Sequence, residues 1–548
     1  MTPPLTSFDF GRKNSGKRGA NIVLTASAVE MSDFYNSQFF AFGGGFSKGP
    51  IPSWLPRKHL YPPVESNHNG IAKYGPYGLR KVEAALLENG FEESDIAVVH
   101  PYHLDAFVGS NTKVVGISTM DPLGMGYVSK TYSSIVGGGE PMNAIEFRDL
   151  VRHPSFQRYK PKIIVGGAGA WQLERKNIMC SYGLDCVVIG ESETIVTELF
   201  TKAAKGENIP TIVHCNPNIA LEEIPTIKHA SIYGCVEISR GCGRNCQFCT
   251  PTMQQRMNFS IDKIMKEVAV NVKEGNGRIT LTTEDIFLYG AKDNGVIPNK
   301  EAVIALLKEV SSYPGVTAVQ PAHMSLAPVV YDPSLIKEAA EILIERNWQG
   351  YRGKPIVTAE TGVETGSVRL MRRYMAGKPL PFRPEEWREL VPQAFGILND
   401  NNWFPLATLI VGLPDETEDD VIETLELIDD LSDYNAFLVP LLFVPLEKCR
   451  LENQSGAELN SLSRLRWELL TECWEYNVRV WRSSFLEFRI RNPLLYNAIT
   501  KFFLPAIGLI SGLYYGAKHG KIVKNSIWSM TGVRENKHKT TCKKSALP

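Results

Sequence analysis

Short apolar segments alternate with helical patterns along most of this chain, and this alternation limits the folds that it can adopt. Near the N-terminus, five such segments read as strands: Ile22–Leu24, Ile96–Val99, Val114–Ser118, Ile163–Val165 and Cys186–Ile189. Buried strands that are separated by helices form parallel sheets with helices on both faces. The sequence therefore predicts an α/β fold whose first domain, residues 1–205, is Rossmann-like.

A second alternating region, residues 234–447, follows a proline-containing stretch that we predict to be a linker, residues 206–233. Its expected strands are Val236–Ser239, Ile279–Thr282, Val316–Val319, Ile356–Glu360, Leu406–Val411 and Phe437–Phe443. Helices are expected at Ile261–Lys273, Lys300–Val310, Ser334–Arg346 and Asp420–Leu431. Six strand–helix repeats are enough for a partial (β/α)6 barrel that is open on one side. Residues 448–548 complete the chain as a helical, aromatic-rich C-terminal region.

The cysteines of one short segment are the strongest chemical signal. Cys242, Cys246 and Cys249 have the spacing C-x3-C-x2-C directly after an expected strand. Three thiolates on one loop can hold three irons of a [4Fe-4S] cluster and leave the fourth iron open. The amine and carboxylate of S-adenosylmethionine (SAM) can chelate such an iron. The alternatives are chance clustering or a zinc site, but zinc prefers four ligands, usually in two pairs, and no second pair is evident.

On these residues the second region resembles the radical SAM superfamily. The resemblance implies that Phe248, before the last cysteine, packs near the adenine of SAM. It places Glu284 or Asp285, in Thr282-Thr283-Glu284-Asp285, where the family has a Gly-Gly-Glu motif that binds the methionine amino group; the two glycines are missing here.

Two further segments extend this resemblance. Thr361-Gly362-Val363-Glu364-Thr365-Gly366 is similar to the family's Gly-x-Glu-Ser-Gly segment, which lines the nucleoside side of the site and makes Glu364 a candidate ligand. The segment from Gly412 to Thr417 is similar to the family's turn before the next helix, and this resemblance makes Gly412 a candidate cofactor-binding residue. It also reads as an ordinary helix start with a Thr417–Asp420 capping box.

The N-terminal region resembles the cobalamin-binding domain of one large radical SAM subclass. The matching strand ends contain Ser118, Gly166, Gly167, Gly190 and Glu191. Glycines at such an edge allow the backbone to approach a large flat cofactor, or they only make tight turns. Cobalamin is expected although the Asp-x-His-x-x-Gly motif for an axial histidine is absent. We interpret His100 and His103, at the end of another strand, as loop or core residues.

The charge is unevenly distributed. Lys+Arg and Asp+Glu total 59 each, so the overall charge gives no indication of a nucleic-acid partner. Eight of the basic residues lie after position 515, directly behind the apolar run Phe502–Tyr515. This run is shorter than the roughly 20 residues that span a bilayer.

The run Phe502–Tyr515 reads either as an anchor for peripheral contact with a membrane or as a core helix followed by a tail. No secretory signal is evident, and a cytoplasmic protein is expected.

The sequence thus resembles a radical SAM enzyme with an N-terminal cobalamin domain. Three segments (77–83, 117–124 and 359–362) resemble archaeal members that act on membrane lipids, nearest the tetraether ring synthases. Our main hypothesis is therefore hydrogen abstraction by a 5′-deoxyadenosyl radical that closes rings in a tetraether lipid, with an electron donor such as ferredoxin or flavodoxin.

The alternatives are a cobalamin-dependent C-methyltransferase acting on a small molecule or lipid, and a non-catalytic cobalamin or iron–sulfur sensor. No catalytic residue is assigned, and Cys449, after the last barrel strand, is interpreted as structural.

Overall fold

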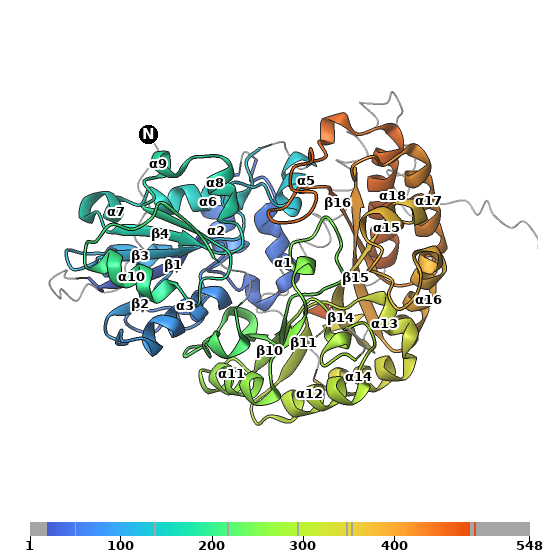
Figure 1. Cartoon of the computed structure of the whole chain (residues 1–548), viewed down its shortest axis with the longest axis horizontal. Coiled ribbons are helices and arrows are strands. Elements are labelled where there is room, and N and C mark those ends of the chain that lie inside the picture. The colour runs from blue at the N-terminus through green and yellow to red at the C-terminus, as the bar shows by residue number, and fades with distance from the viewer. Residues whose placement is uncertain are drawn as a thin grey trace, which may run out of the picture.

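The computed structural model describes residues 19–49, 51–135, 139–215, 219–292, 295–346, 349–351, 354–482 and 487–488. Within these ranges the chain forms two α/β units side by side (Figure 1). The apolar run Phe502–Tyr515 and the basic tail lie outside the described residues, so neither interpretation of them is tested. Among the helices that are described, none combines the length and the hydropathy needed to cross a bilayer.

The first unit is built on a six-stranded parallel sheet with the order β2-β1-β3-β4-β5-β6. Its strands are β1 (Ile22–Ala26), β2 (Ile96–Val98), β3 (Val114–Ser118), β4 (Lys162–Gly166), β5 (Cys186–Ile189) and β6 (Ile212–His214). The five predicted strands are confirmed. The predicted linker is wrong in part, because β6 lies within residues 206–233 and pairs with β5. As a half-exposed edge strand of three residues, β6 lacks the apolar run that marks buried strands.

The second unit contains the six predicted barrel strands: β7 (Cys235–Glu237), β10 (Arg278–Thr282), β11 (Ala318–Pro321), β14 (Val357–Glu364), β15 (Trp403–Val411) and β16 (Phe437–Leu442). They form two parallel three-stranded groups, β7-β10-β11 and β14-β15-β16. A bridge between His323 and Glu360 joins the groups. The result is the expected six-stranded partial barrel, with an open side between β7 and β16.

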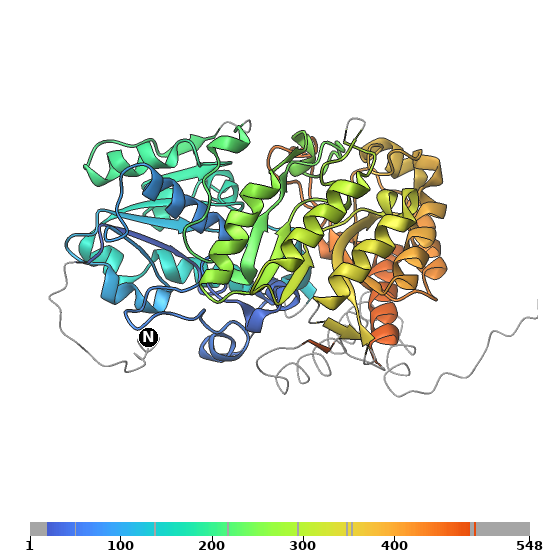
Figure 2. The ribbon, with the colours of Figure 1, turned by 90° about the horizontal axis from the view of Figure 1, so that it is seen from below.

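Helices cover the outside of the barrel, and several lie in front of its strands in Figure 2. The four predicted helices are confirmed as α11 (Ile261–Lys273), α12 (Lys300–Ser312), α14 (Pro333–Glu345) and α17 (Glu418–Asp430). The sequence interpretation missed α13 (Leu326–Tyr331), α15 (Val368–Tyr374) and α16 (Trp387–Asp400). The last contains Pro392, which disfavours helix in a sequence reading.

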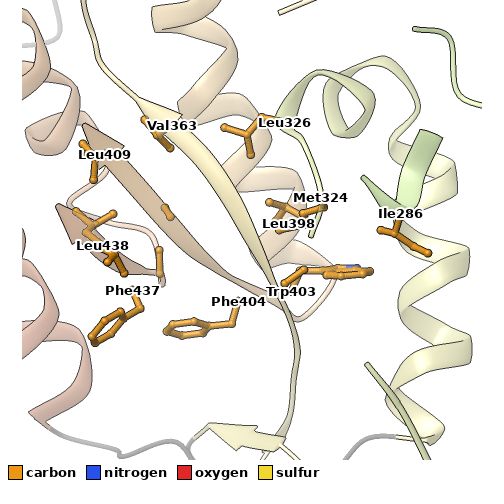
Figure 3. Close-up of a cluster of buried hydrophobic side chains, with 14 of the residues drawn as sticks. Ile286, Met324, Leu326, Val363, Leu398, Trp403, Phe404, Leu409, Phe437 and Leu438 are labelled. Atoms are coloured by element: carbon orange, nitrogen blue, oxygen red, sulfur yellow. The ribbon is translucent and has the colours of Figure 1, made fainter. Parts of the chain in front are cut away.

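The barrel core is a continuous apolar cluster. Figure 3 shows part of it, where Trp403, Phe404 and Leu409 of β15 lie among side chains of β14, β16 and the surrounding helices. The C-terminal region continues this core through α18 (Arg464–Arg482). The amide of Asn477 on α18 exchanges two hydrogen bonds of 2.7 Å each with the backbone of Leu438 in β16. Helix α18 thus confirms the predicted helix for residues 464–482 of the C-terminal region.

The N-terminal unit closes the open side of the barrel. Phe34, Phe40 and Tyr132 of that unit belong to the barrel's own core cluster. The helices α1 (Gln38–Ala41) and α5 (Tyr127–Ile135) lie between the two sheets (Figure 1). On α5, Thr131 Oγ1 accepts a hydrogen bond of 2.9 Å from the backbone N–H of Leu442 in β16. The two units thus share one core and pack as a single body.

A buried polar contact joins the units on their other side. Helix α3 (Tyr77–Glu88) contains the segment 77–83 that resembles archaeal lipid enzymes. Within it, Lys81 Nζ lies 2.5 Å from Glu267 Oε1 on α11, and both side chains are at most 5% exposed. Tyr77 donates a hydrogen bond of 2.7 Å to the other oxygen of the same carboxylate. These residues therefore serve the contact between units, and they carry no information about a lipid substrate.

Replacing one partner of this buried pair should be strongly destabilising. Lys81→Met leaves the Glu267 carboxylate buried without its cation, which costs about 3–5 kcal/mol. The double variant Lys81→Met/Glu267→Met removes both charges and should recover much of that loss. Urea unfolding followed by circular dichroism measures both effects. Lys308→Met, in an exposed ion pair with Glu338, is the control and should cost under about 1 kcal/mol. Equal midpoints for Lys81→Met and Lys308→Met would contradict the assignment.

Candidate active site

The cysteine loop is closed at its base by a short antiparallel ladder. Strands β8 (Ser239–Arg240) and β9 (Met257–Asn258) pair with each other and hold residues 241–256 between them. Inside the loop the N–H of Cys242 donates to the carbonyls of Pro251 (3.1 Å) and Gln254 (3.2 Å). Thr252 Oγ1 donates to the carbonyls of Cys246 (2.9 Å) and Cys249 (3.0 Å). Backbone hydrogen bonds thus preorganise the segment that carries the three thiols.

Two glycines of the loop have left-handed backbone angles for different reasons. Gly241 has φ +76°, and a Cβ there would lie 2.5 Å from the carbonyl oxygen of Gln255. Gly243 has φ +75°, but a Cβ there would lie 3.7 Å from the nearest backbone atom, the nitrogen of Arg256. Gly241 is therefore required by close packing as well as by conformation, and Gly243 by conformation alone.

The three thiols act on one another electrostatically. Burial raises the pKa of Cys246 to about 11, and the neighbouring Cys242 adds to this rise. Burial also raises the pKa of Cys249, as do Glu284 and Cys246. Among the described residues, no three side chains of the usual ligand types converge on one metal ion. A [4Fe-4S] cluster does not need that arrangement, because each cysteine binds a different iron. The donor set therefore fits an iron–sulfur cluster with three cysteine ligands.

The residue before the loop connects it to the N-terminal unit. Arg240 forms ion pairs of 2.9 Å with Glu191 and Glu193, which follow β5, and one of 2.8 Å with Glu237 of β7. All four side chains are at most 22% exposed. Glu191, predicted from the resemblance to contact a cofactor, thus has a partner within the protein. This ion-pair network fixes the end of β5 beside the start of the cysteine loop.

The structure distinguishes the two acidic residues after β10. Asp285 is 1% exposed and accepts hydrogen bonds from the backbone N–H groups of Phe287 and Ser325 (3.2 Å each) and from the Ser325 hydroxyl. Glu284 has no hydrogen bond to another described residue, and its charge acts on Cys249. Of the two, Glu284 is therefore the one with a carboxylate available to a ligand.

The segment at the end of β14 combines a structural and an available part. Thr365, which replaces the family's serine, forms a hydrogen bond of 3.0 Å with Thr424 on α17. Glu364 Oε1 instead accepts a hydrogen bond of 2.7 Å from Lys378 Nζ. The hydroxyl of Thr361 is buried with no hydrogen-bond partner among the described residues. Glu364 is thus ion-paired within the protein, and its contact with the nucleoside stays a prediction.

The turn after β15 has a clear structural role. Gly412 has φ +83°, and its N–H donates to Glu416 Oε2 at 3.0 Å. The same carboxylate lies 2.6 Å from Nε of Arg466 on α18. The capping box of Thr417 and Asp420 at the start of α17 is confirmed. The structure thus gives Gly412 a place in the turn that binds the C-terminal helix, and no described contact gives it a ligand role.

The predicted cofactor residues of the first sheet lie along its carboxyl edge. Ser118 ends β3, Gly166 ends β4, and Gly190 follows β5. A Cβ on Gly166 would make only ordinary van der Waals contact with Val188, at 3.7 Å or more, so no close approach within the protein requires glycine here. A Cβ on Gly167 would lie 2.6 Å from the carbonyl oxygen of Thr119, so Gly167 is needed for the packing of loops. Gly167 therefore has the structural role, and the contact of Gly166 with a cofactor stays a prediction.

The remaining candidate side chains are buried or partly buried. His100 is fully buried, and burial lowers its pKa to about 3, as expected for a neutral core histidine. His103 is half-buried after it, in the same turn. Cys449 is 5% exposed and donates to the carbonyl of Leu446 at 3.1 Å, in keeping with a structural role. Phe248, within the cysteine loop, is partly buried against the barrel core.

The sequence interpretation missed an ionic pair between the two strand groups. His323, after β11, lies with Nδ1 3.1 Å from the carbonyl of Thr283 and with Nε2 3.0 Å from Glu360. Burial acts to lower the pKa of His323, but the contact with Glu360 outweighs it and the pKa rises to about 9. Their side chains are 43% and 33% exposed, unlike those of their neighbours in the core. Isolated in the sequence, His323 gave no signal of this pairing.

The N-terminal unit also contributes to this region. Tyr127, the first residue of α5, follows the loop after β3, and Glu360, Cys249, Glu284 and Glu364 all raise its pKa, together with burial. Together with the ion pairs of Arg240 to Glu191 and Glu193, this places the carboxyl edge of the first sheet beside the cysteine loop of the barrel. Thiols, carboxylates, an imidazole and a phenol lie along these two edges.

Comparisons with known proteins agree with this geometry. Residues 236–428 match the family model described as the Radical SAM superfamily. The tRNA-2-methylthio-N(6)-dimethylallyladenosine synthase of Thermotoga petrophila is 26% identical over 49% of this chain and 56% of its own length. The ribosomal protein uS12 methylthiotransferase RimO of the same organism is 27% identical over 40% of this chain and 45% of its own. This chain thus spans about half the length of these curated relatives.

The fold is similar to that of TsrM from Kitasatospora setae, a radical S-adenosylmethionine methyltransferase. One TsrM structure aligns over 89% of both chains with a TM-score of 0.51 and 12% identity. A second, described with cobalamin and a [4Fe-4S] cluster bound, aligns over 79% of this chain and 74% of TsrM. At this identity the likeness concerns the fold alone. The family match confirms a radical SAM domain, and with it the expected [4Fe-4S] cluster and SAM.

The loop glycines provide a test of the cluster site. Gly241→Ala should disrupt the loop, because its Cβ would collide with the carbonyl of Gln255. Gly243→Ala meets no such atom and should cost only the strain of its backbone angle, about 1 kcal/mol. After anaerobic reconstitution, we expect Gly241→Ala to hold less than half of the wild-type iron and sulfide, and Gly243→Ala to hold nearly all of it. Equal iron in the two variants would contradict this account of the loop.

Proposed function

We propose that this protein is a cobalamin-dependent radical SAM methyltransferase that acts on a small molecule. The observation that carries the proposal is the apposition of two carboxyl edges, one from the sheet that ends in Ser118 and Gly166 and one from the barrel that carries the cysteines. Parallel sheets bind ligands at such edges. Two facing edges can hold two cofactors and an acceptor between them. The fold likeness to TsrM, over 89% of both chains, supports the same arrangement.

In this proposal Cys242, Cys246 and Cys249 hold the [4Fe-4S] cluster. When bound, the cluster supplies the electron that cleaves SAM reductively. Glu284, whose carboxylate has no hydrogen bond to another described residue, accepts hydrogen bonds from the amino group of SAM. Glu364 faces the nucleoside, and Phe248 packs beside the adenine.

Cobalamin is proposed at the edge of the first sheet. No close contact within the protein requires glycine at position 166, and Met120, just after β3, is 71% exposed. A large apolar side chain at a ligand-binding edge suits contact with a flat macrocycle. Tyr127, seven residues further on, lies between this edge and the cysteines. The described residues at this edge include no histidine in the Asp-x-His-x-x-Gly context, so the proposal assigns no axial histidine.

Methyl transfer replaces ring closure as the leading hypothesis. The relatives are named as methylthiotransferases and the similar structure as a methyltransferase, so the comparisons support the alternative hypothesis better. The apolar segment that suggested a lipid lies outside the described residues. The side chains of Glu284, Glu364 and Tyr127 at the two edges suit an acceptor with hydrogen-bonding groups better than a hydrocarbon chain.

The proposal is tested without knowing the acceptor. Reconstituted protein is mixed with cobalamin, a strong reductant and SAM carrying a CD3 methyl group. We expect CD3 transfer to cobalamin with formation of S-adenosylhomocysteine, and also 5′-deoxyadenosine. Formation of 5′-deoxyadenosine without labelled cobalamin would contradict methyl transfer and favour hydrogen abstraction alone. A protein that forms neither product would support the sensor hypothesis.

Cysteine variants test the cluster assignment in the same assay. Cys242→Ala, Cys246→Ala and Cys249→Ala each remove one iron ligand and should abolish 5′-deoxyadenosine. Cys473→Ala, in the buried core of α18, is the matched control and should retain it. Persistence of the product at wild-type rate in any of the three loop variants would show that the cluster is held differently.

A further inference from the structure

Lys378 is a buried cation beside the cysteine loop to which no motif assigned a role. It lies in the irregular segment after α15, and its Nζ is 2.7 Å from Glu364 Oε1. The two side chains are 13% and 8% exposed. A lysine at such depth loses its hydration and is retained where nearby negative charge compensates that loss. Cys246 and Cys249 are among the groups whose charge acts on it.

The cysteine loop itself positions this lysine. Arg244, between the first two cysteines, donates from Nη1 to the carbonyls of Gly377 and Leu380, at 3.3 Å each, and to that of Lys378. A Cβ on Gly377 would lie 2.0 Å from the carbonyl oxygen of Arg244, so the two backbones are in direct contact. Displacement of Lys378 would therefore require movement of the loop.

The glycine of the Gly-x-Glu segment makes room for the same pair. A Cβ on Gly362 would lie 1.9 Å from Glu364 Oε1 and 2.5 Å from Lys378 Nζ. A Cβ at this position would force the ends of both side chains to shift from their present positions. Glycine thus leaves room for the ion pair where it lies, although its backbone angle is not left-handed.

The loop backbone holds the residue that carries this ammonium, through Arg244 and Gly377. Of the charged groups that act on Cys246, Lys378 is the strongest and favours the thiolate, while Glu364 opposes it more weakly. A cluster held by three thiolates is negatively charged, and it gains a further negative charge on reduction. A cation fixed nearby in a medium of low dielectric constant stabilises the more negative state.

We propose that Lys378 is a positioning residue that raises the reduction potential of the iron–sulfur cluster held by Cys242, Cys246 and Cys249. The inference rests on the cluster assignment of the proposed function, and it assigns Lys378 no contact with the methyl acceptor. It predicts that removal of the charge makes the cluster harder to reduce, while a different side chain with the same charge preserves the potential.

A redox titration of the full-length, cluster-loaded protein without SAM tests this inference. The reduced cluster is followed by electron paramagnetic resonance, with titanium(III) citrate as reductant. Lys378→Met should lower the ratio of reduced to oxidised cluster at least tenfold at a fixed potential, which is a shift of about 59 mV for one electron. Lys378→Arg should stay within threefold of wild type. Lys308→Met, an exposed lysine on α12, should not change the ratio.

Gly362→Ala provides a second route to the same result, because its Cβ displaces the pair while the lysine remains. It should shift the ratio in the same direction as Lys378→Met, and it replaces that variant if Lys378→Met holds no cluster. A ratio within twofold of wild type in Lys378→Met, or in Gly362→Ala where it stands in, overturns the role of Lys378. Wild-type protein that forms no [4Fe-4S] cluster would instead overturn the proposed function itself.

Discussion

The ion-pair network of Arg240 is the interaction on which the arrangement of this molecule depends. One guanidinium binds carboxylates from both units, those of Glu191 and Glu193 after β5 and that of Glu237 in β7. A guanidinium can do this because its five donors lie in a rigid planar fork. Arg240 lies two residues before Cys242, so the contact that joins the units also fixes the base of the cysteine loop.

This constraint explains why the polar side chains gather where they do. The shared core closes the open side of the barrel with Phe34, Phe40 and Tyr132 from the N-terminal unit. Beside this shared core the carboxyl edge of the first sheet meets the cysteine loop of the barrel. There the chain places charges in pairs, His323 with Glu360 and Lys378 with Glu364. Each pair compensates a charge that burial would otherwise disfavour.

Patterns that are local in sequence were predictable, and contacts between distant residues were not. Each barrel strand contains or adjoins a short apolar stretch, and the three cysteines lie within eight residues, so both could be found from the sequence. The partners of Arg240 are 47 and 49 residues away, and nothing in Gly190-Glu191-Ser192-Glu193 indicates an arginine. Lys378 comes from an irregular segment without periodicity. The segment 77–83 resembles lipid enzymes in sequence, but the pairing of its Lys81 with Glu267 on α11 is visible only in the fold.

The central claim is that both carboxyl edges border one site that holds the cluster and cobalamin together. Pulsed electron paramagnetic resonance on protein containing cob(II)alamin and the reduced cluster tests this claim most directly, because both centres are paramagnetic. The account predicts a strong magnetic interaction between the two centres in a single molecule, which is lost when Cys249→Ala removes the cluster. Two independent spectra without interaction, or no binding of cobalamin to the cluster-loaded protein, would contradict it.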